Sequence, residues 1–106
     1  MEISKSDWKL FKERLPHWQE RYMEHLLEEY VLFLKSDKPA STKFWELEKQ
    51  IKEDKHHPGV LLSLEKKNVA SVLMRLMKDG AIDENDLEGF SPELKDHVRM
   101  LSNIEW

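Results

Sequence analysis

The segment richest in large apolar side chains is residues 16–34, PHWQERYMEHLLEEYVLFL. At about 100° per residue, these side chains cover more than half the circumference of a helix. A helix that packs against a single neighbour needs a narrower apolar stripe. The segment therefore predicts a central helix, or a helix that also contacts a second chain. Leu27 and Val31 lie at the outer edge of its apolar arc, which makes them candidate partner-binding residues.

An apolar stripe enters this segment from upstream, through Trp8, Phe11, Leu15, Trp18 and Tyr22. Pro16 interrupts the stripe, because proline lacks the amide donor and disfavours helical geometry at the preceding residue. Two arrangements follow. Either a short helix over 7–14, capped by Ser6, ends before a new helix begins at Pro16, or one long helix kinks there. The unbroken stripe favours the kinked helix.

A turn is predicted over 35–40, followed by a second helix that Ser41 or Thr42 caps and that ends at HHPG, residues 56–59. One side of this helix carries apolar residues that we expect to face inward: Ala40, Phe44, Leu47 and Ile51. Trp45 points about 100° away from Phe44. Trp45 and Trp106 are candidate contact residues, since tryptophan is enriched at binding hot spots. Tertiary packing could equally bury both.

The third predicted helix covers residues 60–78 and stops at Gly80. Its inward side chains are expected to be Leu61, Leu62, Val69, Leu73, Leu76 and Met77. A short turn capped by Asp83 follows, and Ser91-Pro92-Glu93 has the cap, proline and acid of a helix start. The last helix is expected to bury Leu94, Val98 and Leu101. The sequence thus predicts an all-α fold: a small bundle of three main helices plus a C-terminal helix, in a single domain over 1–106.

Acidic residues are concentrated between positions 79 and 94, where six acids occur without a base. Acids are favoured at helix N-termini, and this stretch contains two of them in succession. The alternative is an acidic patch for a basic partner, centred on Asp83, Glu84 and Asp86. DGAIDENDL, residues 79–87, resembles half of a calcium-binding loop, but Arg75 and Met77 occupy positions where calcium needs oxygen ligands.

The composition argues against several kinds of chemistry. Cysteine is absent, which excludes disulfides and thiolate sites and fits a reducing cytoplasm. The net charge is −4 without a basic stripe, so direct nucleic-acid binding is not expected. No apolar run approaches the length of a membrane span, and the opening MEISKSDW lacks a signal-type apolar region. We expect a cytoplasmic protein that is not an enzyme and has no catalytic residues, cofactor or metal site.

Three stretches carry a family resemblance: residues 41–60 (SxKFWELExxIKxDKxxPGV), residues 79–98 (DGAIDENDLEGFSPELKDHV) and the opening WKLFKERLPHWQERYMEHLLEEY. In these stretches the chain resembles a family of small helical proteins from Gram-positive gut bacteria and their mobile elements. Some of these proteins carry the label "multidrug transporter", which the lack of a membrane-length apolar run contradicts here. The family resemblance implies no catalytic residue.

Two functions remain in competition. The first is a non-catalytic protein–protein interaction or regulatory module that binds a protein partner or self-associates, as a homodimer, through the face formed by residues 23–34. The alternative is a mobile-element accessory factor that acts on nucleic-acid machinery through the acidic stretch over 79–93.

Overall fold

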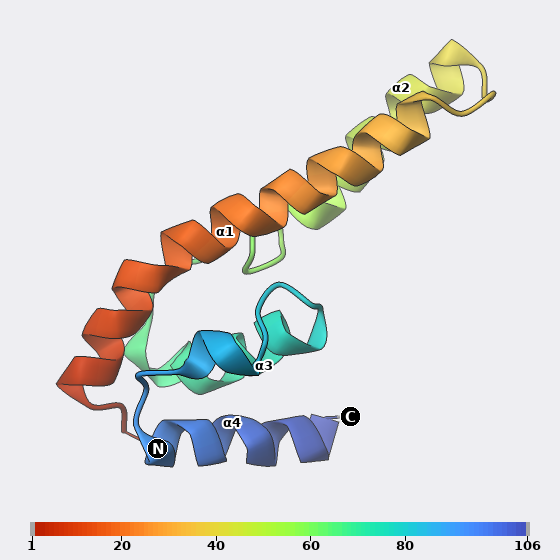
Figure 1. Cartoon of the computed structure of the whole chain (residues 1–106). Helices are drawn as coiled ribbons and strands as arrows, with labels where there is room; N and C mark the ends of the chain where they lie inside the picture. Colours follow the sequence, from red (N-terminus) through yellow and green to blue (C-terminus); the bar gives the residue numbers. More distant parts are fainter. Residues whose placement is uncertain (1, 106) are drawn as a thin grey trace.

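The computed structural model of the chain describes residues 2–105 and is all-α, as predicted (Figure 1). Its four helices are α1 (Lys5–Leu34), α2 (Ala40–Asp54), α3 (Val69–Lys78) and α4 (Pro92–Glu105). Two short 3₁₀ turns, η1 (Lys66–Asn68) and η2 (Glu84–Leu87), precede α3 and α4. No strand occurs within residues 2–105. The predicted number and order of the main helices are therefore confirmed.

The molecule has a head and an arm (Figure 1). The head contains the N-terminal half of α1 together with α3, α4 and their connection. The arm is residues 23–54, in which the C-terminal half of α1 and α2 run antiparallel and project away from the head. This gives overall dimensions of 51 × 27 × 22 Å, so the bundle is less compact than expected. One helix, α1, belongs to both parts.

Helix α1 continues through Pro16 without a break, which settles the choice between one helix and two. Its axis bends in its N-terminal half (Figure 1), as expected where a proline removes one backbone hydrogen bond. The prediction of a cap at Ser6 was wrong by two residues. Ser4 is the N-cap, and its hydroxyl accepts from the amide of Asp7 at 3.1 Å.

The core lies in the head, where one face of α1 meets α3, α4 and the segment that joins them. The largest fully buried side chains come from all of these elements: Phe11, Val69, Leu73, Leu76, Leu87, Leu94 and Val98. Trp18 joins the core and packs near Phe90, with ring centroids 6.4 Å apart. The apolar stripe of α1 and the predicted inward faces of α3 and α4 therefore meet in one cluster.

The connection between α3 and α4 follows the predicted turn chemistry. Gly80 adopts a φ of +77°, and the amide of Ala81 donates to the Leu76 carbonyl at 2.8 Å, as in a Schellman helix end. Asp83 and Asp86 form a capping box around η2. The Ser91 hydroxyl accepts from the Leu94 amide at 3.2 Å, so the predicted start of α4 is correct.

The prediction of a helix over 60–78 was wrong in its first half. Only Val69–Lys78 is α-helical, and residues 61–65 are extended. This segment carries the chain from the end of α2 back to the head. Five residues, 61–65, span about 16 Å when extended but only about 8 Å as a helix. Leu61, expected to face inward, is 70% exposed as a result.

The predicted burial of the apolar side of α2 was also wrong. The helix begins at Ala40, with Pro39 at the N-cap in place of Ser41 or Thr42, and it contains no buried residue. Phe44 is 64% exposed and Ile51 is also exposed. The stripe is amphipathic as expected, but α1 covers only one edge of it, and neither α3 nor α4 reaches the arm (Figure 1).

Candidate functional site

Polar contacts join the two helices of the arm near both of its ends. The Tyr30 hydroxyl donates to the Asp54 carboxylate near the base of α2. Near the tip, the Lys43 Nζ donates to the Leu34 carbonyl at 2.8 Å. These bonds help to fix the antiparallel register of the two helices, while Leu26 is buried and Tyr30, Phe33 and Leu47 are half-buried in the arm.

One side of the arm is an apolar surface that we call the hairpin face. It is formed by two rows of four residues: Met23, Leu27, Tyr30 and Leu34 from α1, and Ala40, Phe44, Leu47 and Ile51 from α2. A groove of about 220 Å³ shows that the rows share one side, because Leu27 and Ile51 both line it. Leu34 lies seven residues after Leu27, and Phe44 seven before Ile51, so each returns to the same side of its helix.

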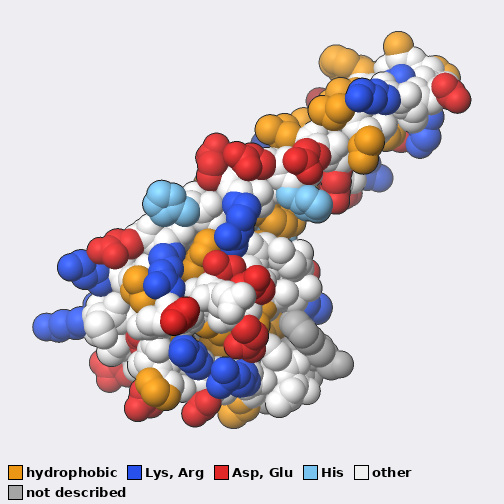
Figure 2. Space-filling model, viewed as in Figure 1, with side chains coloured by type: hydrophobic (Ala, Val, Ile, Leu, Met, Phe, Trp, Pro, Cys, Tyr) orange, Lys and Arg blue, Asp and Glu red, His pale blue; other side chains and the backbone are white. Residues whose placement is uncertain are grey.

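About half of the hairpin face is open to solvent, whereas Met23, Tyr30 and Leu47 are half-buried. Leu27 is 59% exposed, and Leu34, Phe44 and Ile51 are exposed with it. Hydrophobic side chains are visible along the arm to its tip (Figure 2). Soluble proteins rarely expose contiguous apolar patches of this kind unless the patch binds something.

Three of the predicted partner-binding residues lie on the arm. Leu27 is in the hairpin face, and Val31, 47% exposed, borders it on α1. Trp45 is 62% exposed, and its ring contacts Phe44 edge-on with centroids 5.0 Å apart. The chain's own helices cover none of the three within the described residues. Trp106, the other tryptophan considered, lies outside residues 2–105.

The other three predicted residues are in the head and contact other residues there. Asp86 forms an ion pair with Arg21 at 2.9 Å, and Glu84 lies 3.4 Å from Arg99. Asp83 accepts from the Asp86 amide at 3.2 Å. The structure therefore separates Leu27, Val31 and Trp45 from the acidic stretch, and it gives Asp83 and Asp86 roles in holding η2 against α1. Binding of a basic partner by the stretch stays a prediction.

A cluster that the sequence did not reveal joins the head to the arm. His57 is buried, stacks on Tyr22 with ring centroids 4.4 Å apart, and places Nε2 2.7 Å from Asp79. The Gly59 amide donates to Nδ1 at 2.9 Å, so Nε2 carries the proton that Asp79 accepts. Burial, reinforced by the Asp79 carboxylate, raises the pKa of Tyr22.

This histidine–carboxylate pair resembles part of a catalytic triad, but its other nitrogen is occupied. A general base needs a free acceptor nitrogen within reach of a nucleophile. Nδ1 already accepts from Gly59, and Tyr22 covers one face of the ring. We therefore assign the His57–Asp79 pair to structure, namely to fastening the segment after α2 onto the end of α3. Its sequence signal was weak, because adjacent histidines before a proline have no characteristic pattern.

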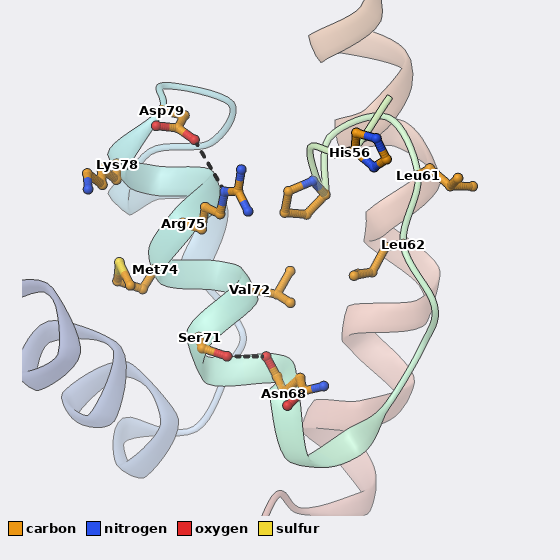
Figure 3. Close-up of a pocket in the computed structure, with 11 residues that line it drawn as sticks. His56, Leu61, Leu62, Asn68, Ser71, Val72, Met74, Arg75, Lys78 and Asp79 are labelled. Atoms are coloured by element: carbon orange, nitrogen blue, oxygen red, sulfur yellow. Dashed lines mark hydrogen bonds and ion pairs between the residues drawn. The ribbon is translucent and has the colours of Figure 1, made fainter. Parts of the chain in front are cut away.

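A groove of about 700 Å³ lies between α3 and the extended segment before it (Figure 3). Val72 and Leu62 face each other across it, whereas Leu61 points away from α3. Arg75 is its central cation, and the Arg75 Nε lies 3.7 Å from Asp79. The lining mixes apolar, basic and acidic groups without a convergent set of donors. Among residues 2–105, no three histidine or carboxylate side chains gather as a metal-binding group.

Comparison with known proteins adds no further assignment. No protein-family model matches the sequence, no curated protein matches it significantly, and no solved structure matches the fold significantly. No helix within the described residues is long and apolar enough to span a membrane. The function must therefore be argued from the arm and the head themselves.

Proposed function

We propose that the chain is a non-catalytic protein–protein interaction module that binds a helical protein segment through the hairpin face. The observation that carries this proposal is the arm itself, which leaves Leu27, Leu34, Phe44 and Ile51 exposed on a helical hairpin anchored in the head core. Several large side chains exposed together have a free-energy reason to be covered, because full burial of each contributes about 1.5–3 kcal/mol. Phe44 and Trp45 add aromatic groups of the kind that dominate binding hot spots.

The shape of the hairpin face favours a helical partner. Two antiparallel helices leave a shallow groove between them, and the groove beside Leu27 and Ile51 is lined mainly by apolar side chains, with Asp54 and Lys55 at its margin. A third amphipathic helix, or a helical pair, fits such a groove through side chains spaced three and four residues apart. An extended peptide would instead need an exposed sheet edge, and no strand occurs within residues 2–105.

A cytoplasmic location is part of the proposal. Cysteine is absent from all 106 residues, as fits a protein that works in a reducing compartment and gains nothing from disulfides. The exposed side chains of the arm would then meet other cytoplasmic proteins, or further copies of the chain.

The test is site-specific photo-cross-linking inside cells. A photoreactive phenylalanine analogue replaces Phe44 in the hairpin face or, as the matched control, Leu61, an apolar residue of similar exposure outside the arm. We expect discrete protein adducts from position 44 and none from position 61. If position 44 gives no adduct at native expression, or if both positions give the same adducts, the hairpin face is not a binding surface.

A further inference from the structure

The two rows of the hairpin face have the spacing of half a four-helix bundle. Both rows follow the same pattern of four, three and four residues, Met23-Leu27-Tyr30-Leu34 in α1 and Ala40-Phe44-Leu47-Ile51 in α2. Alternation of three and four is the repeat by which helices pack side by side at small crossing angles. Each helix therefore presents a complete seam, and the seams have no second pair of helices to face.

We propose that a second copy of the chain covers the hairpin face, so that two arms form a four-helix bundle with α1 beside the partner's α2. This inference rests on the proposed function and names the partner. Identical hairpins carry identical seams, which makes the face complementary to itself under two-fold symmetry. Bundles of this kind place the apolar rows of both hairpins in one shared core.

The head does not obstruct this arrangement. Trp18, which packs into the head core, and Leu27 of the hairpin face are nine residues apart on α1. At about 100° per residue, they point in opposite directions from the helix axis. The head therefore lies behind the hairpin face, and two arms can meet without contact between the heads.

Charged residues at the edges of the hairpin face determine which helix of one copy lies beside which helix of the other. Glu24 and Glu28 follow the outer edge of the α1 row, and neither forms an ion pair within the described residues. Lys52 lies on the outer edge of the α2 row, where it contacts Glu48 of its own helix at 3.6 Å, and Lys55 lines the groove beside Ile51. Acids on one edge and lysines on the other set the orientation of helix pairs.

The register of the arm places these charges at matching heights. Leu27 and Ile51 line one groove and so lie at similar heights on the two antiparallel helices, which places Glu28 and Lys52, and likewise Glu24 and Lys55, within about 3 Å of each other along the arm. A two-fold axis parallel to the helices brings each acid beside the partner's lysine of the same height. An axis perpendicular to them would stack α1 on the partner's α1 and set acid against acid. The charges favour the parallel axis.

The size of the face indicates the strength of the dimer. Residues 23–34 span about 18 Å and two adjacent helices about 20 Å, so each face covers about 360 Å² and two faces together about 720 Å², in the range of weak, transient interfaces. We therefore expect a reversible dimer with a Kd in the micromolar range, which a dilute preparation would miss.

The first experiment measures the oligomeric state of the full chain by sedimentation velocity from about 5 to about 500 μM, the range a micromolar Kd requires. We expect a shift from monomer to dimer. Leu27→Gln and Phe44→Gln should each weaken dimerisation by at least about 10-fold, as expected for central residues of an interface. Leu61→Gln, the matched control, should leave it unchanged. A monomer at every concentration overturns the proposal, as does equal weakening by the control.

The second experiment tests the pairing. The chain has no cysteine, so single replacements can form disulfides only between copies. Under mild oxidation, a mixture of Glu28→Cys and Lys52→Cys chains should yield the mixed dimer in preference to either like pair. The double change Glu24→Lys/Glu28→Lys should weaken dimerisation. Adding Lys52→Glu/Lys55→Glu to that variant should restore it. The matched control, Glu2→Lys/Glu13→Lys, reverses two charges in the head and should leave dimerisation unchanged. Preferred Glu28→Cys like pairs would overturn the arrangement.

The outcomes separate this inference from the proposed function. An adduct from position 44 with twice the 12.7 kDa mass of the chain supports the second copy as the occupant. Adducts of other mass, together with a monomer in sedimentation, overturn the dimer but leave the binding function intact. The absence of any adduct from position 44 overturns the binding function.

Discussion

The carboxylate of Asp7 accepts two hydrogen bonds from Ser91, a residue 84 positions away in the sequence. The Ser91 amide lies 2.9 Å from Oδ1 and its hydroxyl 2.6 Å from Oδ2. Asp7 is only 2% exposed, although it is in the first turn of α1. This contact joins the start of the first helix to the start of the last, and it closes the head.

Replacement of Asp7 by alanine should lower the free energy of unfolding by about 1–3 kcal/mol, because two donors of Ser91 lose a buried partner. Ser91→Ala should cost a similar amount, and the double variant should cost less than the sum of the two. Chemical denaturation of the four proteins measures the coupling. Asp96→Ala, which removes an exposed carboxylate, is the control and should change stability by less than about 0.5 kcal/mol. Strict additivity would show that the contact contributes nothing.

Gly59 should not tolerate a side chain. A Cβ atom there would lie 2.5 Å from the ring of Tyr22, which is shorter than any van der Waals contact. Gly59→Ala should therefore destabilise the chain by about 1–3 kcal/mol, as overpacking does, and Tyr22→Ala should relieve most of that added cost. Thermal unfolding of the single and double variants is the measurement. At Gly80 the constraint is the backbone and not space, because no atom lies near its Cβ position but φ is +77°. Gly80→Asn should therefore destabilise the chain less than Gly80→Ala.

The arm and its junction with the head should lose stability in alkali. Burial, and then the hydrogen bond to Asp54, raise the pKa of Tyr30, while burial also raises that of Tyr22. Unfolded tyrosine ionises near pH 10, so the unfolded chain releases these protons first. The stability they provide is complete below about pH 10 and is lost as the pH rises through the higher folded values.

Comparison of Tyr30→Phe with the unmodified chain separates the contribution of the Tyr30 hydroxyl from the titration of lysines, which both proteins share. At pH 8 the variant should be less stable by about 1 kcal/mol, because a hydrogen bond is lost. Above pH 10 the difference between the two proteins should shrink. Thermal unfolding followed by circular dichroism between pH 8 and 11 provides the comparison. A difference that stays constant across this range would contradict the assignment.

The three predicted acids of the head should differ in their effect on stability. Asp86→Asn should cost about 1 kcal/mol or more, because the Asp86 carboxylate accepts from the Asp83 amide in the capping box of η2 and pairs with Arg21. Asp83→Asn should cost less, since asparagine is also a good cap, and Glu84→Gln should fall within about 0.5 kcal/mol. Urea denaturation ranks the three variants. If binding of a basic partner depends on Glu84 despite its small effect on stability, the acidic stretch regains its functional interpretation.

Backbone amides of α2 should exchange with solvent far faster than those of α3. Helix α2 has no buried residue, whereas Leu73 and Leu76 of α3 are completely buried. Local opening of the arm therefore costs less free energy than opening of the head. Hydrogen–deuterium exchange followed by mass spectrometry measures both helices in one sample. Protection of α2 that increases with protein concentration would agree with a dimer, while α3 serves as the internal control.

The helices were predictable because their apolar periodicity and end signals are strong. The caps at Asp83 and Ser91 and the stop at Gly80 are local, so they can be read without knowledge of the fold. The extended segment over 61–65 was missed because its leucines fit a helical pattern, and the distance that it must cross depends on where α2 ends in space.

The candidate site was predictable only in part. The apolar arc of α1 was too wide for one neighbour, so the exposure of Leu27 and Val31 has a cause in the sequence. Phe44 and Ile51 were expected to be buried, because an amphipathic stripe predicts a covered face without indicating whether this chain or another supplies the cover. The Tyr22–His57–Asp79 cluster depends on three distant segments, and no local pattern marks it.

The arm can change its length without changing the head. Insertion of one heptad into α1 after Leu27, matched by one in α2 before Ile51, would extend the arm by about 10 Å while each row kept its orientation. No contact of the head core would move, since every buried residue of α1 except Leu26 precedes Tyr22. The distance between the head and the tip of the arm can thus change independently of the packing of the head.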